Sequence, residues 1–256
     1  MTSFPRSIGQ SDPPLSPRQT LPTMYDLPSE DPEEPGLPDE YHEFQPPMLR
    51  QTFQPSNYDP EEVFVAADLN LYYDWHHPNW YKRPDWFAVV GVSRLYEGRD
   101  LRMSYVMWQE QVSPFVVVEL LSPGTENEDL GRTVSQTGKP PTKWQVYEQI
   151  LRVPYYFVFS RYTNEVQAFH LVGGHYESMT PESDRFSVPE LGLSLGLWEG
   201  SYERINRLWL RWFTQSGEMI LTPEEDAIAQ AVAAQAKAEL LAAKLRELGI
   251  DPDQLS

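Results

Sequence analysis

Two carboxylates and one lysine stand at positions that suit metal-dependent hydrolysis of a phosphodiester. Asp85 precedes the apolar run Phe87–Val92, and Glu119 closes the apolar run Phe115–Val118. Runs of this length and composition are typical of buried strands, so both carboxylates are expected at strand ends. One or two carboxylates and substrate phosphate are enough to hold Mg²⁺, and a lysine such as Lys143 can assist the attacking water. The three residues therefore predict a magnesium-dependent phosphodiesterase site, with Asp85 and Glu119 as metal ligands.

Each of these residues also has a structural explanation. Asp85 follows a proline and could simply cap a turn, and a lysine in a first helical turn is usually exposed to solvent. Glu119 is different, because a carboxylate that ends four consecutive apolar residues is expected to be partly buried. A buried unpaired charge costs on the order of several kcal/mol unless a metal or a cation compensates it. The functional hypothesis rests on the three residues as a set, with Glu119 as its strongest member.

Lys143 opens the clearest internal helix, which is predicted from residue 142 to about residue 152. Two prolines precede it, and Thr142 with Gln145 three residues later forms the capping-box pattern. Tyr147 follows Lys143 by four residues and shares its helix face, so its hydroxyl is expected to point into the same site.

Further apolar segments predict a β-rich core around these residues. The additional predicted strands are Val63–Ala67, Tyr155–Ser160 and Val166–Val172. Gly173-Gly174 is a turn signal that predicts a hairpin into His175–Glu177. Residues 191–197 alternate large and small side chains, which suits a late edge strand or its entry; their glycines lack the context of a nucleotide-binding loop.

Composition divides the chain into three parts. Residues 1–57 are rich in proline, serine and acids without periodicity, which predicts a disordered tail that solubilises the protein or recruits a partner. Residues 58–213 are expected to form one folded domain. In residues 214–256, the alanine-rich run Pro223–Leu248 predicts a helix, with a coiled-coil contact and a solvent-exposed helix as alternatives.

Charge and residue types limit the function classes. The 256 residues contain no cysteine, which excludes disulfides, thiol nucleophiles and cysteine-ligated zinc. The net charge of −18 argues against a nucleic-acid partner, yet residues 63–213 carry 14 basic and 18 acidic groups and are nearly balanced. A secretory signal and a run of about 20 apolar residues are both absent, so a cytoplasmic protein without membrane contact is expected.

Several sequence blocks resemble the Uma-type restriction endonuclease family of the PD-(D/E)XK nuclease superfamily. These blocks are Arg83-Pro84-Asp85, residues 117–125, residues 128–131, Lys143 with Tyr147, and residues 153–156. The Glu-Leu-Leu-Ser-Pro sequence that begins at Glu119 is the specific part, whereas Pro-Asp alone would be weak. The similarity covers about residues 60 to 200, and the alanine-rich C-terminal segment resembles tails found on many members.

The resemblance implies an α/β (α+β) fold with a restriction-endonuclease-like mixed sheet flanked by helices. It implies Asp85 and Glu119 as ligands of Mg²⁺, with Mn²⁺ as an alternative, and DNA as the substrate. Cleavage of both strands often requires a dimer, so a homodimer is compatible with this class. The implied activity is that of an endonuclease hydrolysing DNA phosphodiester bonds.

The resemblance also bears on the lysine. The superfamily commonly places a lysine two positions after the glutamate, where this chain has Leu121. In the family the lysine lies on the following helix, which matches Lys143. The connection across residues 132–142 is longer than the family usually has, so Lys139 stays an alternative, and helix phase with Tyr147 favours Lys143.

Other residues offer weaker candidates. Asp68 suits either a further acidic ligand or a cap. His76 and His77 are adjacent and do not face one another, so a shared metal is not expected. With Trp75, Trp80 and Tyr81 they suit either a surface for stacking bases or ordinary packing. Two other function classes remain alternatives: a catalytically silent interaction protein with a nuclease fold, and a metal hydrolase of smaller phosphate esters.

Overall fold

The computed structural model describes residues 12–14, 39–122, 126–133, 138–249 and 251. The chain divides into two compact units, residues 1–44 and 45–256. Every strand and every residue of the predicted site lies in the second unit.

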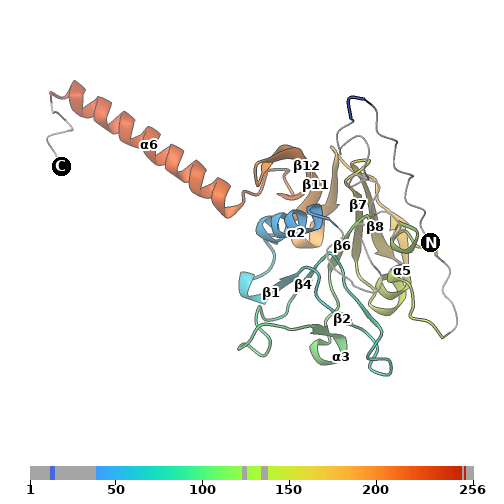
Figure 1. Cartoon of the computed structure of the whole chain (residues 1–256). Helices are drawn as coiled ribbons and strands as arrows, with labels where there is room; N and C mark the ends of the chain where they lie inside the picture. The colour runs from blue at the N-terminus through green and yellow to red at the C-terminus, as the bar shows by residue number, and fades with distance from the viewer. Residues whose placement is uncertain (1–11, 15–38, 123–125, 134–137, 250, 252–256) are drawn as a thin grey trace. The chain divides into compact units, whose positions relative to one another are not determined.

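A six-stranded mixed sheet forms the centre of the second unit (Figure 1). Its strands lie in the order β1 (Val63–Ala66), β4 (Trp86–Val90), β6 (Val116–Leu120), β7 (Tyr155–Ser160), β8 (Glu165–Val172) and β9 (His175–Ser178). Only β6 and β7 pair in parallel within this sheet of described residues. A parallel pair needs a crossover, which here contains α4 (Glu126–Asp129), α5 (Lys143–Gln145) and the π-helix η2 (Val146–Ile150).

The strands predicted between residues 63 and 177 are confirmed to within two residues at each end. The predicted hairpin between β8 and β9 is also confirmed, and both of its turn residues, Gly173 and Gly174, have positive φ. Glycine adopts this conformation without steric cost, which is why the dipeptide was informative. The expected mixed sheet with helices, an α+β architecture, is therefore observed.

The two faces of the central sheet carry separate cores. Phe87 and Val117 pack with Tyr147 of η2 in one buried cluster. Trp86, the neighbour of Phe87, points to the opposite face and approaches Trp212, with ring centroids 5.9 Å apart. The helical segment thus packs on one face, and a second sheet packs on the other.

The second sheet has the order β10 (Arg185–Val188), β11 (Leu193–Tyr202) and β12 (Ile205–Thr214). The expectation of an edge strand at 191–197 is wrong, because β11 pairs with β10 on one side and with β12 on the other. A third, short sheet contains β3 (Tyr81–Lys82), β2 (Leu71–Tyr72) and β5 (Tyr105–Val106), and the remaining short helices are η1 (Pro60–Glu62), α3 (Met107–Glu110) and η3 (Pro189–Leu191).

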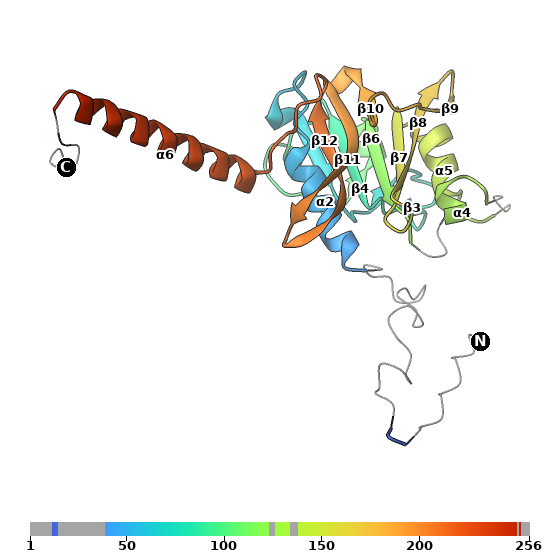
Figure 2. The ribbon, with the colours of Figure 1, turned by 90° about the horizontal axis from the view of Figure 1, so that it is seen from above.

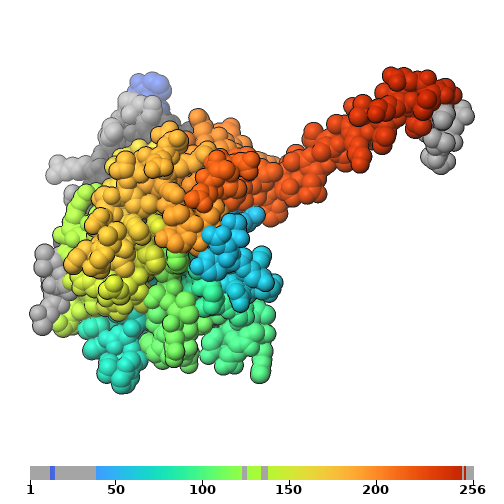
Figure 3. Space-filling model, turned by 180° about the vertical axis from the view of Figure 1, so that it is seen from behind, coloured from blue at the N-terminus to red at the C-terminus, as the bar shows by residue number. Residues whose placement is uncertain are grey.

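Helix α2 (Tyr41–Thr52) corrects the prediction of disorder over residues 1–57. The amide of Gln45 accepts from the N–H of Leu210 at 2.9 Å and donates to its carbonyl at 2.7 Å. Leu210 lies on β12, an edge strand, so one side chain satisfies both exposed main-chain groups. Figures 2 and 3 show α2 (blue) beside β12 (orange to red). The composition of this segment did not indicate a helix, because α2 is stabilised by contact with a strand that is distant in the sequence. Residues 1–11 and 15–38 of the predicted tail lie outside the described residues.

The predicted C-terminal helix is confirmed as α6 (Pro223–Glu247), which has a capping box between Thr222 and Glu225. None of its residues is buried. Its first turn is attached to β12, where the fully buried guanidinium of Arg211 forms a bidentate ion pair with Glu225. Within the described part of the chain, no helix combines the length and the apolarity needed to cross a membrane.

Candidate active site

The antiparallel pairing of β4 with β6 brings the two predicted carboxylates together. Trp86 pairs with Val118, so Asp85, just before β4, lies opposite Glu119 near the end of β6. The Asp85 carboxylate accepts from the N–H of Leu120 at 2.6 Å, and the Glu119 carboxylate lies 3.4 Å from the N–H of Asp85. Each carboxylate is therefore held by the main chain of the other strand.

Glu119 is completely buried and is held by polar contacts on both carboxylate oxygens. Its Oε1 accepts from the Tyr147 hydroxyl at 2.7 Å. Its Oε2 faces Lys143 Nζ at 3.1 Å and the N–H of Asp85. The predicted orientation of Tyr147 into the site is thus observed, and Oε2 is the oxygen on the side of Asp85.

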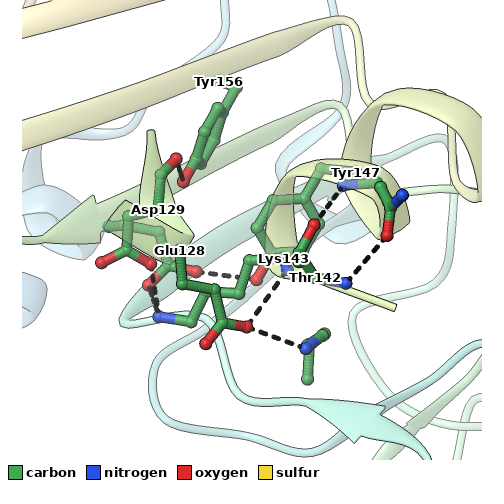
Figure 4. A network of polar contacts seen from close by, with 9 residues as sticks. Glu128, Asp129, Thr142, Lys143, Tyr147 and Tyr156 are labelled. Atoms are coloured by element: carbon green, nitrogen blue, oxygen red, sulfur yellow. Dashed lines mark hydrogen bonds and ion pairs between the residues drawn. The ribbon is translucent and has the colours of Figure 1, made fainter. Parts of the chain in front are cut away.

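Lys143 lies between two buried carboxylates (Figure 4). Its Nζ is 3.1 Å from Glu119 and 2.9 Å from Oδ1 of Asp129, and these acids are 0% and 1% exposed. Asp129 ends α4, and its carbonyl accepts from the hydroxyl of Tyr156 at 2.8 Å. The crossover and the sheet together therefore place a third acid beside the two predicted ones.

The start of the helix is fixed by its own sequence and by Glu128. Thr142 and Gln145 form both hydrogen bonds of the predicted capping box. Glu128 accepts from the N–H of Lys143 at 3.2 Å and from Nζ of Lys82 at 3.1 Å. A carboxylate at a helix N-terminus is favourable, and this one offsets the unfavourable position of the lysine charge.

The α-helix that begins at Lys143 changes to a π-helix at Val146. Val146 bonds back to Thr142 with ordinary α-helical spacing, whereas Leu151 bonds to Val146, five residues earlier. Such π-turns are frequent at functional sites. Here the α-helical turn and the π-turn together direct Lys143 and Tyr147 toward the same carboxylate.

The protonation of Glu119 reflects its surroundings. Burial, and then the charges of Asp85 and Asp129, raise its pKa to about 8, against the opposing effects of Lys143 and Tyr147. Burial acts in the opposite direction on Lys143, but Glu119 and Asp129 outweigh it and raise the Lys143 pKa well above its ordinary value. At neutral pH Lys143 is therefore a cation.

Tyr147 stays a hydrogen-bond donor in this environment. Burial, followed by the neighbouring charge of Glu119, raises the pKa of its hydroxyl well above the ordinary value. Its role at the site is to fix the orientation of the carboxylate rather than to exchange a proton with it.

A comparison with models of protein families identifies the family to which the chain belongs. The model of the Uma2 family, described as "Putative restriction endonuclease", matches residues 23–205. The chain belongs to the Uma2 family. A comparison with curated proteins finds no match. The match begins well before residue 60, where the sequence blocks started, and it includes α2.

The chemistry of the acidic residues at this site bears on whether it can hold a divalent cation. Among the described residues, no group of three or more His, Cys, Asp or Glu side chains is arranged to hold a metal ion. Mg²⁺ needs fewer protein ligands, because it keeps several waters and takes substrate oxygens. The carboxylates of Glu119 and Asp129 both contact Lys143 Nζ, and burial, followed by the charges of Asp85 and Asp129, raises the pKa of Glu119 against the opposing effect of Lys143. The donor set therefore fits Mg²⁺ bound by Asp85 and Glu119.

Among the remaining sequence candidates, Asp68 lies beside this cluster, because its N–H donates at 3.0 Å to the carbonyl of Pro84, the residue before Asp85. Lys139 is exposed, which leaves Lys143 as the lysine that reaches Glu119. Asp68 forms an ion pair with Arg83. His76 and His77 both contact Asp74, with the closer pair at 2.7 Å. Asp68 therefore serves as a charge partner in the loop before β2.

Sequence reasoning missed Asp129 as a site residue. It belongs to the Glu128–Gly131 block of the family resemblance, and that block was the available signal. Its place beside Lys143 depends on the crossover geometry, which local pattern does not specify. Residues 123–125 of the neighbouring block lie outside the described residues.

Proposed function

We propose that this Uma2-family protein is a magnesium-dependent endonuclease that hydrolyses DNA phosphodiester bonds at Asp85, Glu119 and Lys143. The observation that supports it is the buried cluster in which Lys143 Nζ lies 3.1 Å from Glu119 and 2.9 Å from Asp129. Burying several acids in an apolar environment costs free energy unless a cation binds beside them. In a nuclease fold, such a cation can take part in hydrolysis of the phosphodiester bond.

The carboxylates would hold the metal. Oε2 of Glu119 lies 3.4 Å from the main-chain N of Asp85, while Tyr147 donates to Oε1 and keeps the carboxylate from rotating. Bound Mg²⁺, with Mn²⁺ as a substitute, supplies neutralisation of phosphate charge and a water that loses its proton more easily. Deprotonation of Glu119 accompanies metal binding, because its pKa of about 8 lies above neutral pH.

Lys143 would act as an electrostatic stabiliser. Its raised pKa keeps it protonated at neutral pH, so it cannot serve as the general base. As a donor it can orient the attacking water or bind a phosphate oxygen as negative charge develops. Asp129 positions the ammonium group from the opposite side.

Cleavage of supercoiled plasmid with Mg²⁺ or Mn²⁺ tests the proposal. The wild type should nick and linearise the DNA, whereas Asp85→Asn and Glu119→Gln should abolish cleavage. Lys139→Gln is the matched control, because Lys139 is exposed and lies outside the cluster. Each variant keeps its side-chain size, and its thermal unfolding should first be compared with the wild type.

A panel of substrates separates the proposal from its rivals. Single-stranded DNA, RNA and a small aromatic phosphodiester should be assayed beside the plasmid. Hydrolysis of the small ester with all nucleic acids left intact would contradict the endonuclease and favour a hydrolase of smaller esters. A wild type that is inert on every substrate would favour a non-catalytic interaction protein.

A further inference from the structure

A second site lies at the end of α2, away from the acidic cluster. A cavity of about 770 Å³ is lined by Arg50 at the end of α2, by the segment that follows, by β1 and by Arg94. The volume falls within the usual range for small-molecule sites. Its wall is largely apolar and aromatic, with Phe53, Tyr58 and Val65 among the lining residues.

The cavity and the acidic cluster lie at opposite ends of β4. Asp85 precedes this strand, whereas Val63, which lines the cavity, pairs with its last residue, Val90. Five residues of strand separate them by about 16 Å. Val63 and Val65 also point away from Phe64, which packs in the core with Tyr147, so the cavity opens on the other face of the sheet.

The two arginines of the cavity lack acidic partners. Among the described residues, neither the Arg50 nor the Arg94 side chain forms an ion pair or a hydrogen bond. Burial, and then the neighbouring charge of Arg94, lowers the pKa of Arg50, so the two cations oppose one another. Arg102, from the same loop as Arg94, is bound by both oxygens of Glu110 at 2.7 and 3.0 Å.

A structural role explains only one of these cations. Arg50 is in the last turn of α2, where a positive charge is favourable. Arg94 comes from the loop after β4 and gains nothing from that helix. Exposed Arg50 and half-buried Arg94 thus bring two guanidinium groups without acidic partners to one cavity, in a chain of net charge −18, and this favours an anionic ligand.

The wall of the cavity is held in place before any ligand binds. Phe53 makes edge contacts with Trp86 and Trp212, each with ring centroids 5.2 Å apart. Asn57, in the same segment, donates to the carbonyl of Glu190 at 2.9 Å. A pocket supported in this way needs little reorganisation to bind.

We propose that this cavity binds a nucleoside monophosphate, either free or as the 5′-phosphorylated end of a strand. The phosphate lies between Arg50 and Arg94, and the base and sugar lie against Phe53 and Tyr58. A phosphate monoester carries about −1.5 to −2 charges at neutral pH, which matches two arginines better than a carboxylate or a phosphodiester does. Aromatic walls accept the face or edge of any base.

Calorimetric titration with 2′-deoxyadenosine 5′-monophosphate tests the proposal. The titration is done in EDTA, so that no divalent cation contributes. The nucleotide should bind more tightly than inorganic phosphate or deoxyadenosine. Arg50→Gln and Arg94→Gln should each weaken it by about tenfold or more, while Arg99→Gln, an exposed arginine outside the cavity, should leave it unchanged. Thermal unfolding of each variant checks the fold.

Two further measurements identify the form of the ligand and separate its site from the acidic cluster. A 5′-phosphorylated oligonucleotide that binds better than its 5′-hydroxyl form identifies a strand end as ligand, whereas binding of the mononucleotide alone identifies a free nucleotide. Asp85→Asn with Glu119→Gln should retain nucleotide binding, which separates this site from the proposed nuclease centre. Loss of binding in that variant, unchanged binding in the arginine variants, equal affinity for inorganic phosphate, or no binding of the nucleotide would each overturn the proposal.

Discussion

Glu119 is the residue at the proposed site whose burial changes its protonation. Its carboxylate is completely shielded from solvent and adjoins two other acids, so its pKa of about 8 exceeds the ordinary value of 4.5. A raised carboxyl pKa means that the folded protein binds this proton more tightly than the unfolded chain does. The resulting stabilisation is complete below pH 4.5 and is lost as the pH rises to about 8.

The first prediction concerns this pH dependence in the metal-free protein. Relative to Glu119→Gln, which cannot titrate, the wild type should lose on the order of a few kcal/mol of unfolding free energy between about pH 5 and pH 8. Urea unfolding in EDTA across this range measures the difference. A constant difference between the two proteins would show that Glu119 is already ionised at pH 5. Burial raises the pKa of Glu128, but the neighbouring Lys82 outweighs it and lowers this pKa below 4.5. Glu128 therefore changes protonation below the range of pH 5 to 8 and does not contribute to this difference.

The second prediction separates the two candidate lysines. Lys143→Gln should slow DNA cleavage by about a hundredfold or more, because a positioned donor to developing charge is lost. Lys139→Gln should keep the wild-type rate, since its exposed side chain makes no contact with the acidic cluster. Initial rates of oligonucleotide cleavage at saturating Mg²⁺ measure both. Equal losses in the two variants would contradict the assignment of Lys143.

At the scale of elements, the contact between Gly131 and Trp144 bears on how Lys143 reaches the sheet. Gly131, just after α4, has a φ of +68°, and a Cβ added there would lie 2.6 Å from Cδ2 of Trp144. Trp144 follows Lys143 directly, so its displacement moves the lysine. The absence of a side chain at Gly131 therefore allows α4 and α5 to approach closely.

The third prediction tests this close approach. Gly131→Ala should cost about 1 kcal/mol from backbone strain and about 1 to 3 kcal/mol more from overpacking, and it should also reduce cleavage. Gly98→Ala is the matched control, because Gly98 has the same φ of +68° with no atom within 4 Å of the added Cβ. Chemical unfolding and cleavage rates should be compared for both. If the two substitutions cost the same, the contact with Trp144 does not position the helix.

Elements with strong local signals could be predicted from sequence, and elements stabilised by distant partners could not. The capping box at Thr142 and the apolar runs around Asp85 and Glu119 are local, which is why these residues were identified. By contrast, α2 depends on the contact of Gln45 with β12. Strand β12 was not predicted, because its buried Arg211 interrupts the apolar pattern expected of a strand in the core. Asp129 was missed because only the crossover brings it to Lys143.

For the whole molecule, α6 is attached at its first turn and contributes little to the core. The Arg211–Glu225 ion pair is the buried link, and no residue of α6 beyond it is buried. Neither the predicted boundaries at residues 58 and 213 nor a coiled-coil partner for α6 has been tested, and both remain predictions.

The fourth prediction concerns this attachment. A chain ending at Asp226 keeps the ion pair and should unfold at the same temperature as the full chain. Glu225→Gln in the full chain preserves the capping box but leaves Arg211 as a buried unpaired charge, which should cost about 3 kcal/mol or more. Differential scanning calorimetry measures both. A large loss of stability on truncation would show that α6 packs on the molecule.

The central claim is that half-buried Asp85, just before β4, and buried Glu119, in β6, form a cation site. The most direct test is Mg²⁺ titration by calorimetry at pH 7, in buffers of different ionisation enthalpy, for the wild type and Glu119→Gln. Because the pKa of Glu119 is about 8, the wild type should bind Mg²⁺ and release close to one proton, and the variant should lose both the binding and the release. Equal affinity and proton release in the two proteins, or no binding in either with an oligonucleotide present, would contradict the account.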